Sequence, residues 1–249
     1  MKITMIGAGA MGGATVEGLL RAKSFKQEEI TVADPTAEVL EKFKAMGVNT
    51  TTNNADAAKT ADIVCVCVKP WLVDTVLAGI RASIRPKDQL PERVREALPE
   101  TPPFFLVIPN IAIAQLASMT FMVPVGADDA QTATVKGIFD EMGSTLITDF
   151  QHLAAGTTLA SCGIAYAMRY IRAASEGGVE LGFKADVAKD IVMQTVLGAV
   201  KLLQASGMHP EQAIDLVTTP GGVTIKGLNE MEHAGFTSAV IRGLKAGLK

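Results

Sequence analysis

Short apolar runs and longer segments of helical periodicity alternate along the first 150 residues of the chain. KITMIG, EITVAD and ADIVCVCV are typical of strands, and VNTTT is a candidate for one more. Helical patterns follow the first two runs, from about Met11 to Ala22 and from Glu38 to Met46, and Asn53 or Asn54 is placed to cap a third helix. The alternation predicts an α/β domain with a doubly wound, mostly parallel sheet.

The pattern changes after Asp149, beyond which we find no strand signal. Residues Val187 to Leu203 place apolar side chains at the spacing of an amphipathic helix. Leu159 to Ala174 predicts another helix, with Gly177 and Gly178 beyond its end. We therefore predict an α/β domain over residues 1–150 and an all-helical domain over residues 151–249.

The helical domain contains the charge-free stretch Leu153 to Met168. A helix without a polar face is normally buried against another surface, and a domain of roughly 100 residues is small for supplying all of that surface itself. We expect these helices to form a homodimer or a higher homo-oligomer.

A second charge-free stretch runs from Pro102 to Gly126. A membrane-spanning helix needs about 20 consecutive apolar residues, but Pro109, Asn110, Gln115 and Pro124 interrupt this one. Two short buried strands, FFLVIP and MTFMVPV, describe it better. We expect no membrane segment here.

Composition narrows the possible functions. The 249 residues carry 23 Lys and Arg against 26 Asp and Glu, a net charge of -3, which argues against a nucleic-acid partner or a polybasic membrane surface. Three cysteines are too few for a disulfide framework, and the three histidines lack metal-ligand spacing. With no signal peptide at the N-terminus, these features favour a cytoplasmic protein without a metal site.

The strongest motif is Gly7-Ala8-Gly9-Ala10-Met11-Gly12, which follows a predicted strand and opens a predicted helix. In such a loop Gly7 allows the tight turn, Gly9 lets the backbone approach a pyrophosphate, and Gly12 lets helix and strand pack closely. The helix N-terminus then offers amides and a positive dipole end to phosphate groups. The motif predicts a dinucleotide site; a glycine-rich turn without a ligand is the alternative.

Asp34 ends the second predicted strand, where an acidic residue typically binds the adenosine ribose and disfavours a 2′-phosphate. No Arg or Lys occurs in the next seven residues. NADH is therefore slightly favoured over NADPH. The alternative is an ordinary helix N-cap, because Pro35 stands where a first helical residue would be.

The fourth predicted strand ends in Val68-Lys69-Pro70. Ligands of open parallel sheets lie outside the carboxyl ends of the strands, so this turn should face the nicotinamide half of the cofactor. Lys69 contributes charge there or is a solvated loop lysine.

These residues resemble the pyrroline-5-carboxylate reductase family. IGAGAMGGA at Ile6 to Ala14 is similar to its nucleotide loop, Val68 to Pro70 to its turn after the fourth strand, and Pro109-Asn110 to its Met-Pro-Asn segment. The best match is Asp215 to Glu232, which is similar to the family's helix end, Pro-Gly-Gly turn and new helix. The resemblance implies a Rossmann-type domain followed by a helical dimerisation domain, and it adds Asn110 to the cofactor-binding residues.

The resemblance also implies a substrate site at Thr219, Gly221, Gly222, Val223 and Thr224, with Thr224 as the catalytic residue. Exposed amides at a helix N-terminus suit a small carboxylate, and the Thr224 hydroxyl is able to hydrogen-bond a ring nitrogen. Reduction of a protonated imine needs mainly orientation, so no strong general acid is required. The alternative is a plain turn with Thr224 as helix N-cap.

The chain departs from the family pattern in four places, one of which is the turn Thr219 to Thr224, where the family has Ser-Pro-Gly-Gly-Thr-Thr. No Arg precedes Pro109, and Ala160 to Tyr166 replaces the family's Ser-Gly-Ser-Gly-Pro-Ala-Tyr. The strand that the family has before FFLVIP is missing: Leu90 runs through Pro91 into a helical pattern. Either the fold closes without that strand or the chain as given omits residues there.

We thus expect a reductase that transfers a hydride from NADH or NADPH to the cyclic imine 1-pyrroline-5-carboxylate and produces L-proline. A related reductase for another imine or a β-hydroxyacid is the nearest alternative. A nucleotide-binding regulatory homologue without activity is the alternative from outside the enzymes.

Overall fold

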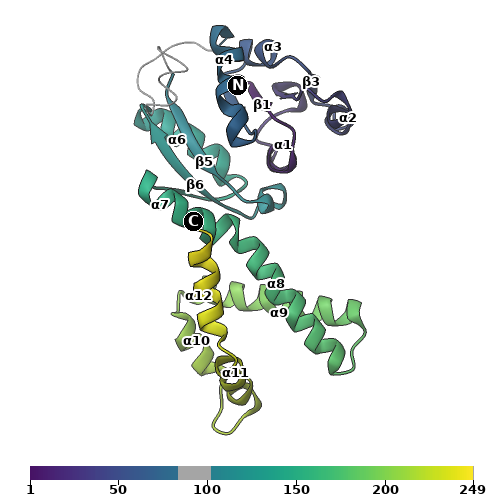
Figure 1. Cartoon of the computed structure of the whole chain (residues 1–249), viewed down its shortest axis with the longest axis vertical. Coiled ribbons are helices and arrows are strands. Elements are labelled where there is room, and N and C mark those ends of the chain that lie inside the picture. The colour runs from purple at the N-terminus through teal and green to yellow at the C-terminus, as the bar shows by residue number, and fades with distance from the viewer. Residues whose placement is uncertain (84–101, 249) are drawn as a thin grey trace. The chain divides into compact units, whose positions relative to one another are not determined.

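The computed structural model describes residues 1–83 and 102–248. The chain forms two compact parts, which we call the N-terminal unit (Met1–Ser161) and the C-terminal unit (Cys162–Lys249). Figure 1 shows strands only in the first of them, and helices throughout the second. The predicted order, an α/β domain and then a helical one, is confirmed within the described residues.

The N-terminal unit begins with a parallel four-stranded sheet of order β3-β2-β1-β4. Ile3 is aligned with Ile30 on one side and with Ile63 on the other, so β1 is central. In this order β2 and β3 lie on one side of β1 and β4 lies on the other, as in a doubly wound sheet. The strands are β1 (Ile3–Ile6), β2 (Ile30–Ala33), β3 (Asn49–Thr51) and β4 (Ile63–Val66).

Helices connect these strands much as the apolar pattern predicts. Asn53, one of the two proposed caps, accepts hydrogen bonds from the amides of Ala55 and Asp56 and starts the third helix. The connecting elements are α1 (Ala10–Ala22), η1 (Gln27–Glu29), α2 (Ala37–Ala45), α3 (Asn54–Lys59), η2 (Pro70–Leu72), α4 (Val73–Ile80) and η3 (Arg81–Ser83).

The core of this unit lies between the sheet and its helices. Val16 and Leu19 of α1 and Phe43 of α2 are almost completely buried, together with Ile30 and Val32 of β2. Each such side chain stabilises the fold by about 1.5–3 kcal/mol on transfer from water. The glycine loop before α1 is therefore attached to a helix that the core holds firmly.

The charge-free stretch 102–126 forms two strands, as expected, within a second sheet of order β5-β6-β7. β5 pairs antiparallel with β6, and β6 pairs parallel with β7. The elements are β5 (Phe104–Ile108), η4 (Ile111–Gln115), β6 (Ser118–Val125), α6 (Asp129–Asp140) and β7 (Gly143–Ile147). Leu90 and Pro91, where the extra family strand is expected, lie outside the described residues.

The N-terminal unit continues through α7 (Phe150–Gly156) and a π-helical turn, Thr157–Ser161, which we call the π-turn. A Cβ on Gly156 would lie 2.7 Å from the ring of Phe121 in β6, so α7 touches the sheet at van der Waals distance. This packing explains why the compact unit ends after Ser161, whereas the pattern suggested a boundary after residue 150.

The C-terminal unit consists of α8 (Gly163–Glu180), α9 (Ala185–Ser206), α10 (Pro210–Leu216), α11 (Val223–His233) and α12 (Phe236–Ala246). Gly177 and Gly178 lie inside α8 and not beyond its end, so that prediction was wrong. The physical reason is packing: a Cβ on Gly178 would lie 2.9 Å from the Cβ of Ala188, so glycine lets α8 and α9 approach closely.

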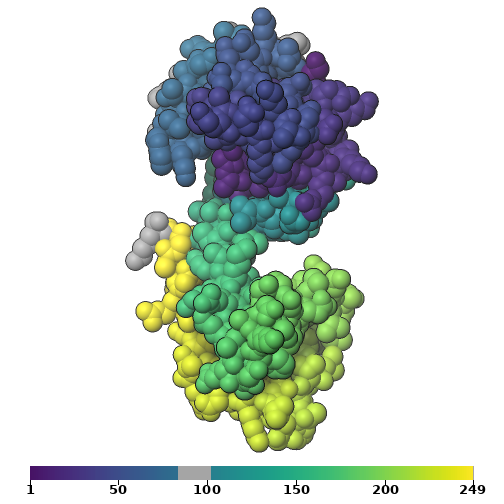
Figure 2. All heavy atoms as spheres, turned by 90° about the vertical axis from the view of Figure 1, so that its right-hand side faces the viewer, coloured from purple at the N-terminus to yellow at the C-terminus, as the bar shows by residue number. Residues whose placement is uncertain are grey.

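The helices of the C-terminal unit cover little of their own apolar surface. Ala188 is its only buried residue among residues 162–248. Apolar residues of α8 and α9 such as Met168, Ile191 and Val200 are exposed, and the green spheres of these helices form an open surface in Figure 2. A patch of this kind marks a protein-binding surface.

The described helices are too short or too polar to cross a membrane singly. No single helix in the described part of the chain is long and apolar enough to cross a bilayer. Ala185–Ser206 and Pro210–Leu216 satisfy the length and composition limits only as a pair, and the two are bent by 113°.

Candidate functional site

The glycine loop, Gly7–Gly12, connects β1 to α1 and is held by backbone contacts. Gly7 has φ +99°, a region that favours glycine, and its amide donates to the carbonyl of Ala33 at 2.8 Å. A Cβ on Gly7 would overlap the carbonyl oxygen of Cys67, and one on Gly12 would overlap the carbonyl oxygen of Gly7. Side chains at either position would thus push the loop away from the end of β4.

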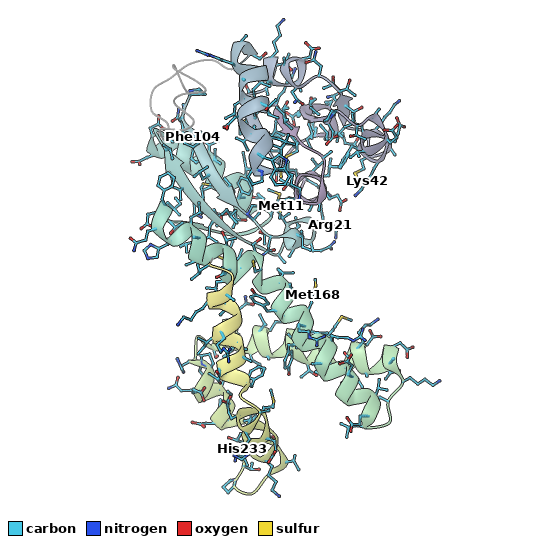
Figure 3. The ribbon with its side chains drawn as sticks, viewed as in Figure 1. Met11, Arg21, Lys42, Phe104, Met168 and His233 are labelled. Carbon is cyan, nitrogen blue, oxygen red and sulfur yellow. The ribbon has the colours of Figure 1, made fainter. Side chains whose placement is uncertain are left out.

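The opposite side of the loop is open. A Cβ on Gly9 would meet nothing within 4 Å, and no side chain caps the N-terminus of α1, where Gly9 is the N-cap residue. Met11 is the second residue of α1 and lies at the N-terminus of that helix (Figure 3). An uncapped helix end beside a bare glycine is suited to a pyrophosphate, which fits a dinucleotide.

Asp34 joins the loop to the end of β2. One carboxylate oxygen accepts from the amide of Ala8 at 2.9 Å, and the other accepts from the amide of Thr36 at 3.0 Å. The N-cap of α2 is Thr36, so the alternative in which Asp34 caps that helix was wrong. The sequence did not identify Ala8 as the partner of Asp34. The position of Ala8 between Gly7 and Gly9 does place its backbone amide in the loop at the end of the neighbouring strand.

The turn after β4 also lies at the loop. A Cβ on Gly7 would be 2.9 Å from Cγ1 of Val68, so Val68 and the glycine loop are neighbours. Lys69 is exposed and is the N-cap residue of η2, with Pro70 as the first residue of that 3-10 helix. The geometry therefore brings Val68, Lys69 and Pro70 to the carboxyl ends of β1 and β4, as the motif predicted.

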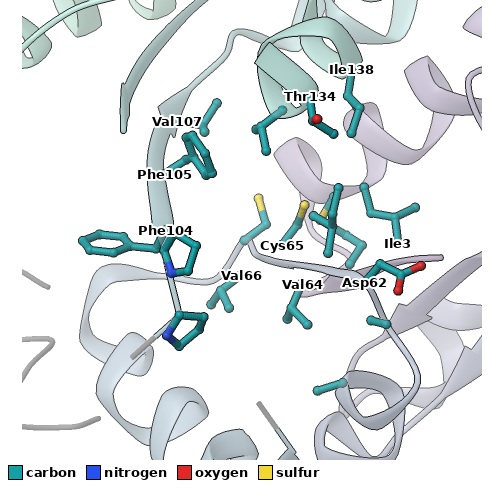
Figure 4. A pocket seen from close by; sticks show the side chains of 18 of the residues that line it. Ile3, Asp62, Val64, Cys65, Val66, Phe104, Phe105, Val107, Thr134 and Ile138 are labelled. Carbon is teal, nitrogen blue, oxygen red and sulfur yellow. The ribbon is translucent and has the colours of Figure 1, made fainter. Parts of the chain in front are cut away.

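A cavity of about 940 Å³ lies where β4 and β5 face each other. Its walls include Val64 and Cys65 on one side and Phe105 and Val107 on the other (Figure 4). Among the described residues, β4 pairs only with β1 and β5 pairs only with β6. The predicted parallel sheet is thus divided at this point.

Cys65 lies in β4 and Cys67 follows directly after that strand, and neither thiol is activated by its surroundings. Burial raises the pKa of the Cys65 thiol to about 12, and the neighbouring Cys67 adds to the effect. Burial also raises the pKa of Cys67. At neutral pH both thiols stay protonated, and only the thiolate is a good nucleophile or metal ligand.

Asn110 follows β5 and is only 4% exposed. Its side-chain oxygen accepts from the amide of Ala112 at 3.0 Å and caps η4, and its amide nitrogen donates to the carbonyl of Ala160 at 3.4 Å. Its backbone amide donates to the hydroxyl of Ser118 at 3.2 Å. Asn110 is therefore surrounded by protein groups, in contrast to the open Gly9.

In the C-terminal unit, Thr219, Pro220, Gly221 and Gly222 form a tight turn that we call the Pro-Gly-Gly turn. The amide of Gly222 donates to the carbonyl of Thr219 at 2.9 Å, and Gly221 has φ +70°. Pro followed by a residue with positive φ is typical of a type II turn.

Helix α11 starts directly after this turn. Gly222 is its N-cap residue, without any side-chain cap, so the alternative in which Thr224 is the cap was wrong. Val223 is 86% exposed and Thr224 is also exposed. The expected substrate residues thus surround an open helix N-terminus, a suitable place for a carboxylate.

The proposed site residues form two groups. The glycine loop, Asp34 and the Val68–Pro70 turn come together in the N-terminal unit, and Thr219 to Thr224 come together in the C-terminal unit.

Comparison with known protein families separates the same two parts. Residues 151–249 match the model for pyrroline-5-carboxylate reductase dimerisation, so the chain carries a dimerisation domain. Residues 2–90 match the model described as NADP oxidoreductase, coenzyme F420-dependent.

Curated relatives match nearly the whole chain. Pyrroline-5-carboxylate reductase 2 of Dictyostelium discoideum is 31% identical over 98% of this chain and 89% of its own length. The Synechocystis pyrroline-5-carboxylate reductase is 30% identical over 99% of this chain and 95% of its own length. Pyrroline-5-carboxylate reductase 1 of Dictyostelium discoideum is 36% identical, but the chain spans only 48% of it. That alignment is 262 positions long, more than the 249 residues here, so the relative has residues without a counterpart.

Solved structures show the same fold. The 1-pyrroline-5-carboxylate reductase of Streptococcus pyogenes is 27% identical, with a TM-score of 0.86 over 100% of this chain and 96% of that one. The Plasmodium falciparum pyrroline carboxylate reductase, solved with NADP bound, has a TM-score of 0.88 at 23% identity, over 100% of this chain and 95% of that one. On the combined evidence of the two family models and these relatives, the chain belongs to the pyrroline-5-carboxylate reductase family.

Proposed function

We propose that this chain reduces 1-pyrroline-5-carboxylate to L-proline with a reduced nicotinamide nucleotide. Family membership supports the substrate, since the relatives named above carry that name. The observation that carries the proposal is the glycine loop: its inner side is closed by Cys67, and its outer side is bare at Gly9. Such a loop fits a pyrophosphate.

The nucleotide would be held by residues from three segments of the N-terminal unit. Backbone amides at the start of α1 bind the phosphates, Asp34 binds the ribose, and the turn after β4 contacts the nicotinamide half. The proposed cofactor-binding residues are Gly7, Gly9, Ala10, Met11, Gly12, Asp34, Val68, Lys69 and Pro70, with Asn110 discussed below.

We propose a modest preference for NADH over NADPH. A carboxylate at the end of β2 repels a 2′-phosphate. Lys42, the first basic residue after Asp34, forms an ion pair with Glu17, so its charge is already compensated. No other Lys or Arg lies between Asp34 and Lys42.

The substrate carboxylate would bind at the N-terminus of α11, beside Thr219, Gly221, Gly222 and Val223. The amides there carry a partial positive charge that attracts an anion. Thr224, in the first turn of α11, would hydrogen-bond the ring nitrogen and orient the imine.

When bound, the reduced nicotinamide supplies the hydride that the imine carbon accepts. The residues of this chain then have one task, which is orientation: the helix end fixes the carboxylate and Thr224 fixes the nitrogen. A protonated imine becomes a neutral amine on accepting the hydride, so the step needs no strong general acid from the protein.

The active assembly would be a homodimer or a higher homo-oligomer through the C-terminal helices. The exposed apolar residues of α8 and α9 support this, because they need a covering surface. The three free cysteines support a reducing compartment such as the cytoplasm.

The decisive experiment is an assay of NADH and NADPH oxidation with 1-pyrroline-5-carboxylate, paired with calorimetric binding of each nucleotide. We expect turnover with both and a higher kcat/KM with NADH. A clear NADPH preference would overturn the interpretation of Asp34, and turnover only with another cyclic imine or a β-hydroxyacid would reassign the substrate.

A nucleotide-binding protein without catalysis is the second candidate. The observation in its favour is that, over residues 1–83 and 102–248, no strand joins β4 to β5. Normal nucleotide affinity together with no turnover on any of these substrates would identify it.

A further inference from the structure

Asn110 occupies an unusual position for a residue expected to bind a cofactor. Its side chain has two different protein partners: the oxygen caps η4 through Ala112, and the nitrogen reaches Ala160 in the π-turn. It is nearly buried, so neither atom is open in the way that the α1 N-terminus is open.

The two partners of Asn110 belong to segments with different roles. On one side, η4 packs against α1: a Cβ on Gly18 would lie 2.6 Å from the carbonyl of Ile113, and Arg21 donates to the Gln115 side chain at 2.6 Å. On the other side, the π-turn is the last part of the N-terminal unit before α8 begins. Asn110 therefore links the nucleotide helix to the segment from which the chain enters the C-terminal unit.

The π-turn depends on contacts of this kind. A π-helical turn is rare and occurs often at functional sites. Here the hydroxyls of Thr157 and Thr158 donate to the carbonyls of Leu153 and Ala155, and Thr158 is buried. The hydrogen bond from the side-chain amide of Asn110 to the carbonyl of Ala160 connects this turn to the segment that follows β5.

We propose that Asn110 is a positioning residue that holds the π-turn against η4, and that it does not contact the nucleotide. This role rests on the proposed reductase function, because the π-turn leads into the C-terminal unit, which carries the proposed substrate residues. Asn110 would affect catalysis by holding the start of that segment in place. Loss of this hydrogen bond between Asn110 and Ala160 should loosen the π-turn and lower the efficiency of imine reduction, but leave nucleotide binding intact.

Asn110→Asp tests the proposal. Aspartate is as good an N-cap as asparagine, so η4 keeps its cap, whereas the donor to Ala160 is lost. The matched control is Asn49→Asp in β3, where the amide nitrogen also donates to a backbone carbonyl, that of Glu28, at 2.9 Å. If Asn110→Asp does not fold, Asn110→Ser keeps a capping oxygen and removes the same donor.

Two measurements decide the outcome. Hydrogen exchange of the amides of residues 157–165 should be about 10-fold faster in Asn110→Asp than in the wild type or the control. The kcat/KM for the imino acid should fall about 10-fold, while the Kd for NADH stays within about 2-fold.

Unchanged exchange over residues 157–165 overturns the positioning role, and so does a large loss of NADH affinity, which would identify a direct ligand. A wild-type protein without turnover means that the proposed function fails. The exchange measurement then still decides whether Asn110 holds the π-turn.

Discussion

The two units share one feature, a glycine-rich helix start without a side-chain cap, but they support it to different extents. In the N-terminal unit the glycine loop is enclosed by its own chain, because Cys67 and Ala33 contact Gly7 and the core holds α1. In the C-terminal unit the Pro-Gly-Gly turn is exposed, and a Cβ on Gly221 would meet nothing within 4 Å.

Burial differs in the same way. The N-terminal unit encloses two clusters of buried apolar side chains, whereas Ala188 is the single buried residue of the C-terminal unit over residues 162–248. The proposed nucleotide site is therefore built by one folded unit with its own core. The proposed substrate site lies on helices that remain largely exposed.

Gly12→Ala should have the largest effect and tests whether the glycine loop of the N-terminal unit is enclosed by its own chain. The new Cβ would overlap the Gly7 carbonyl, which is backbone and has no room to move, so the loop must distort. We expect NADH affinity to fall about 100-fold, or about 2.8 kcal/mol, by calorimetry.

Gly9→Ala is the control for this substitution, because its Cβ meets no protein atom. It should leave the thermal unfolding midpoint unchanged while it weakens nucleotide binding, whereas Gly12→Ala should lower the midpoint as well. An unchanged NADH affinity in Gly12→Ala would show that the loop is not enclosed in the way described.

Met168→Glu tests the C-terminal unit, the more exposed of the two. Met168 is 57% exposed on α8, from which it projects in Figure 3, and a charge that is partly desolvated in a subunit interface weakens association. We expect sedimentation velocity at micromolar concentration to show about a 10-fold weaker assembly. Gln204→Glu adds the same charge at an exposed position of α9 and should leave the assembly intact. A folded wild-type monomer at that concentration would contradict the proposed oligomer.

Thr224→Ala should have a smaller effect, confined to catalysis. Removing one hydrogen bond to the imine costs about 1 kcal/mol, so kcat/KM should fall about 5- to 10-fold with the NADH Kd unchanged. Thr237→Ala, which removes a surface hydroxyl bonded to Glu232, should not change either value. Equal rates in both variants would remove Thr224 from the site.

The local patterns were sufficient for most elements of the N-terminal unit. Asn53 caps α3 and the glycine loop opens α1, because capping and tight turns depend on residues that are close in sequence. The C-terminal turn is of the same kind, since Pro220 and Gly221 define its geometry locally.

Residues that depend on distant neighbours were predicted less well. Gly178 was expected to end a helix, but Ala188 of α9 requires a small residue inside α8. Asp34 was open to interpretation as a cap, and only the position of Ala8 beside it decided its partner. The compact N-terminal unit also includes α7 and the π-turn, because Phe121 packs on Gly156.

The sequence by itself therefore determined the fold class, the nucleotide loop and the turn before α11, since each arises from short-range backbone preferences and hydrophobic periodicity. Only the tertiary structure decided how β4 and β5 face each other across a cavity and what the side chain of Asn110 contacts. Those contacts join residues separated by tens of positions, as Asn110 and Ala160 are, and no local pattern specifies which distant carbonyl a buried amide will reach.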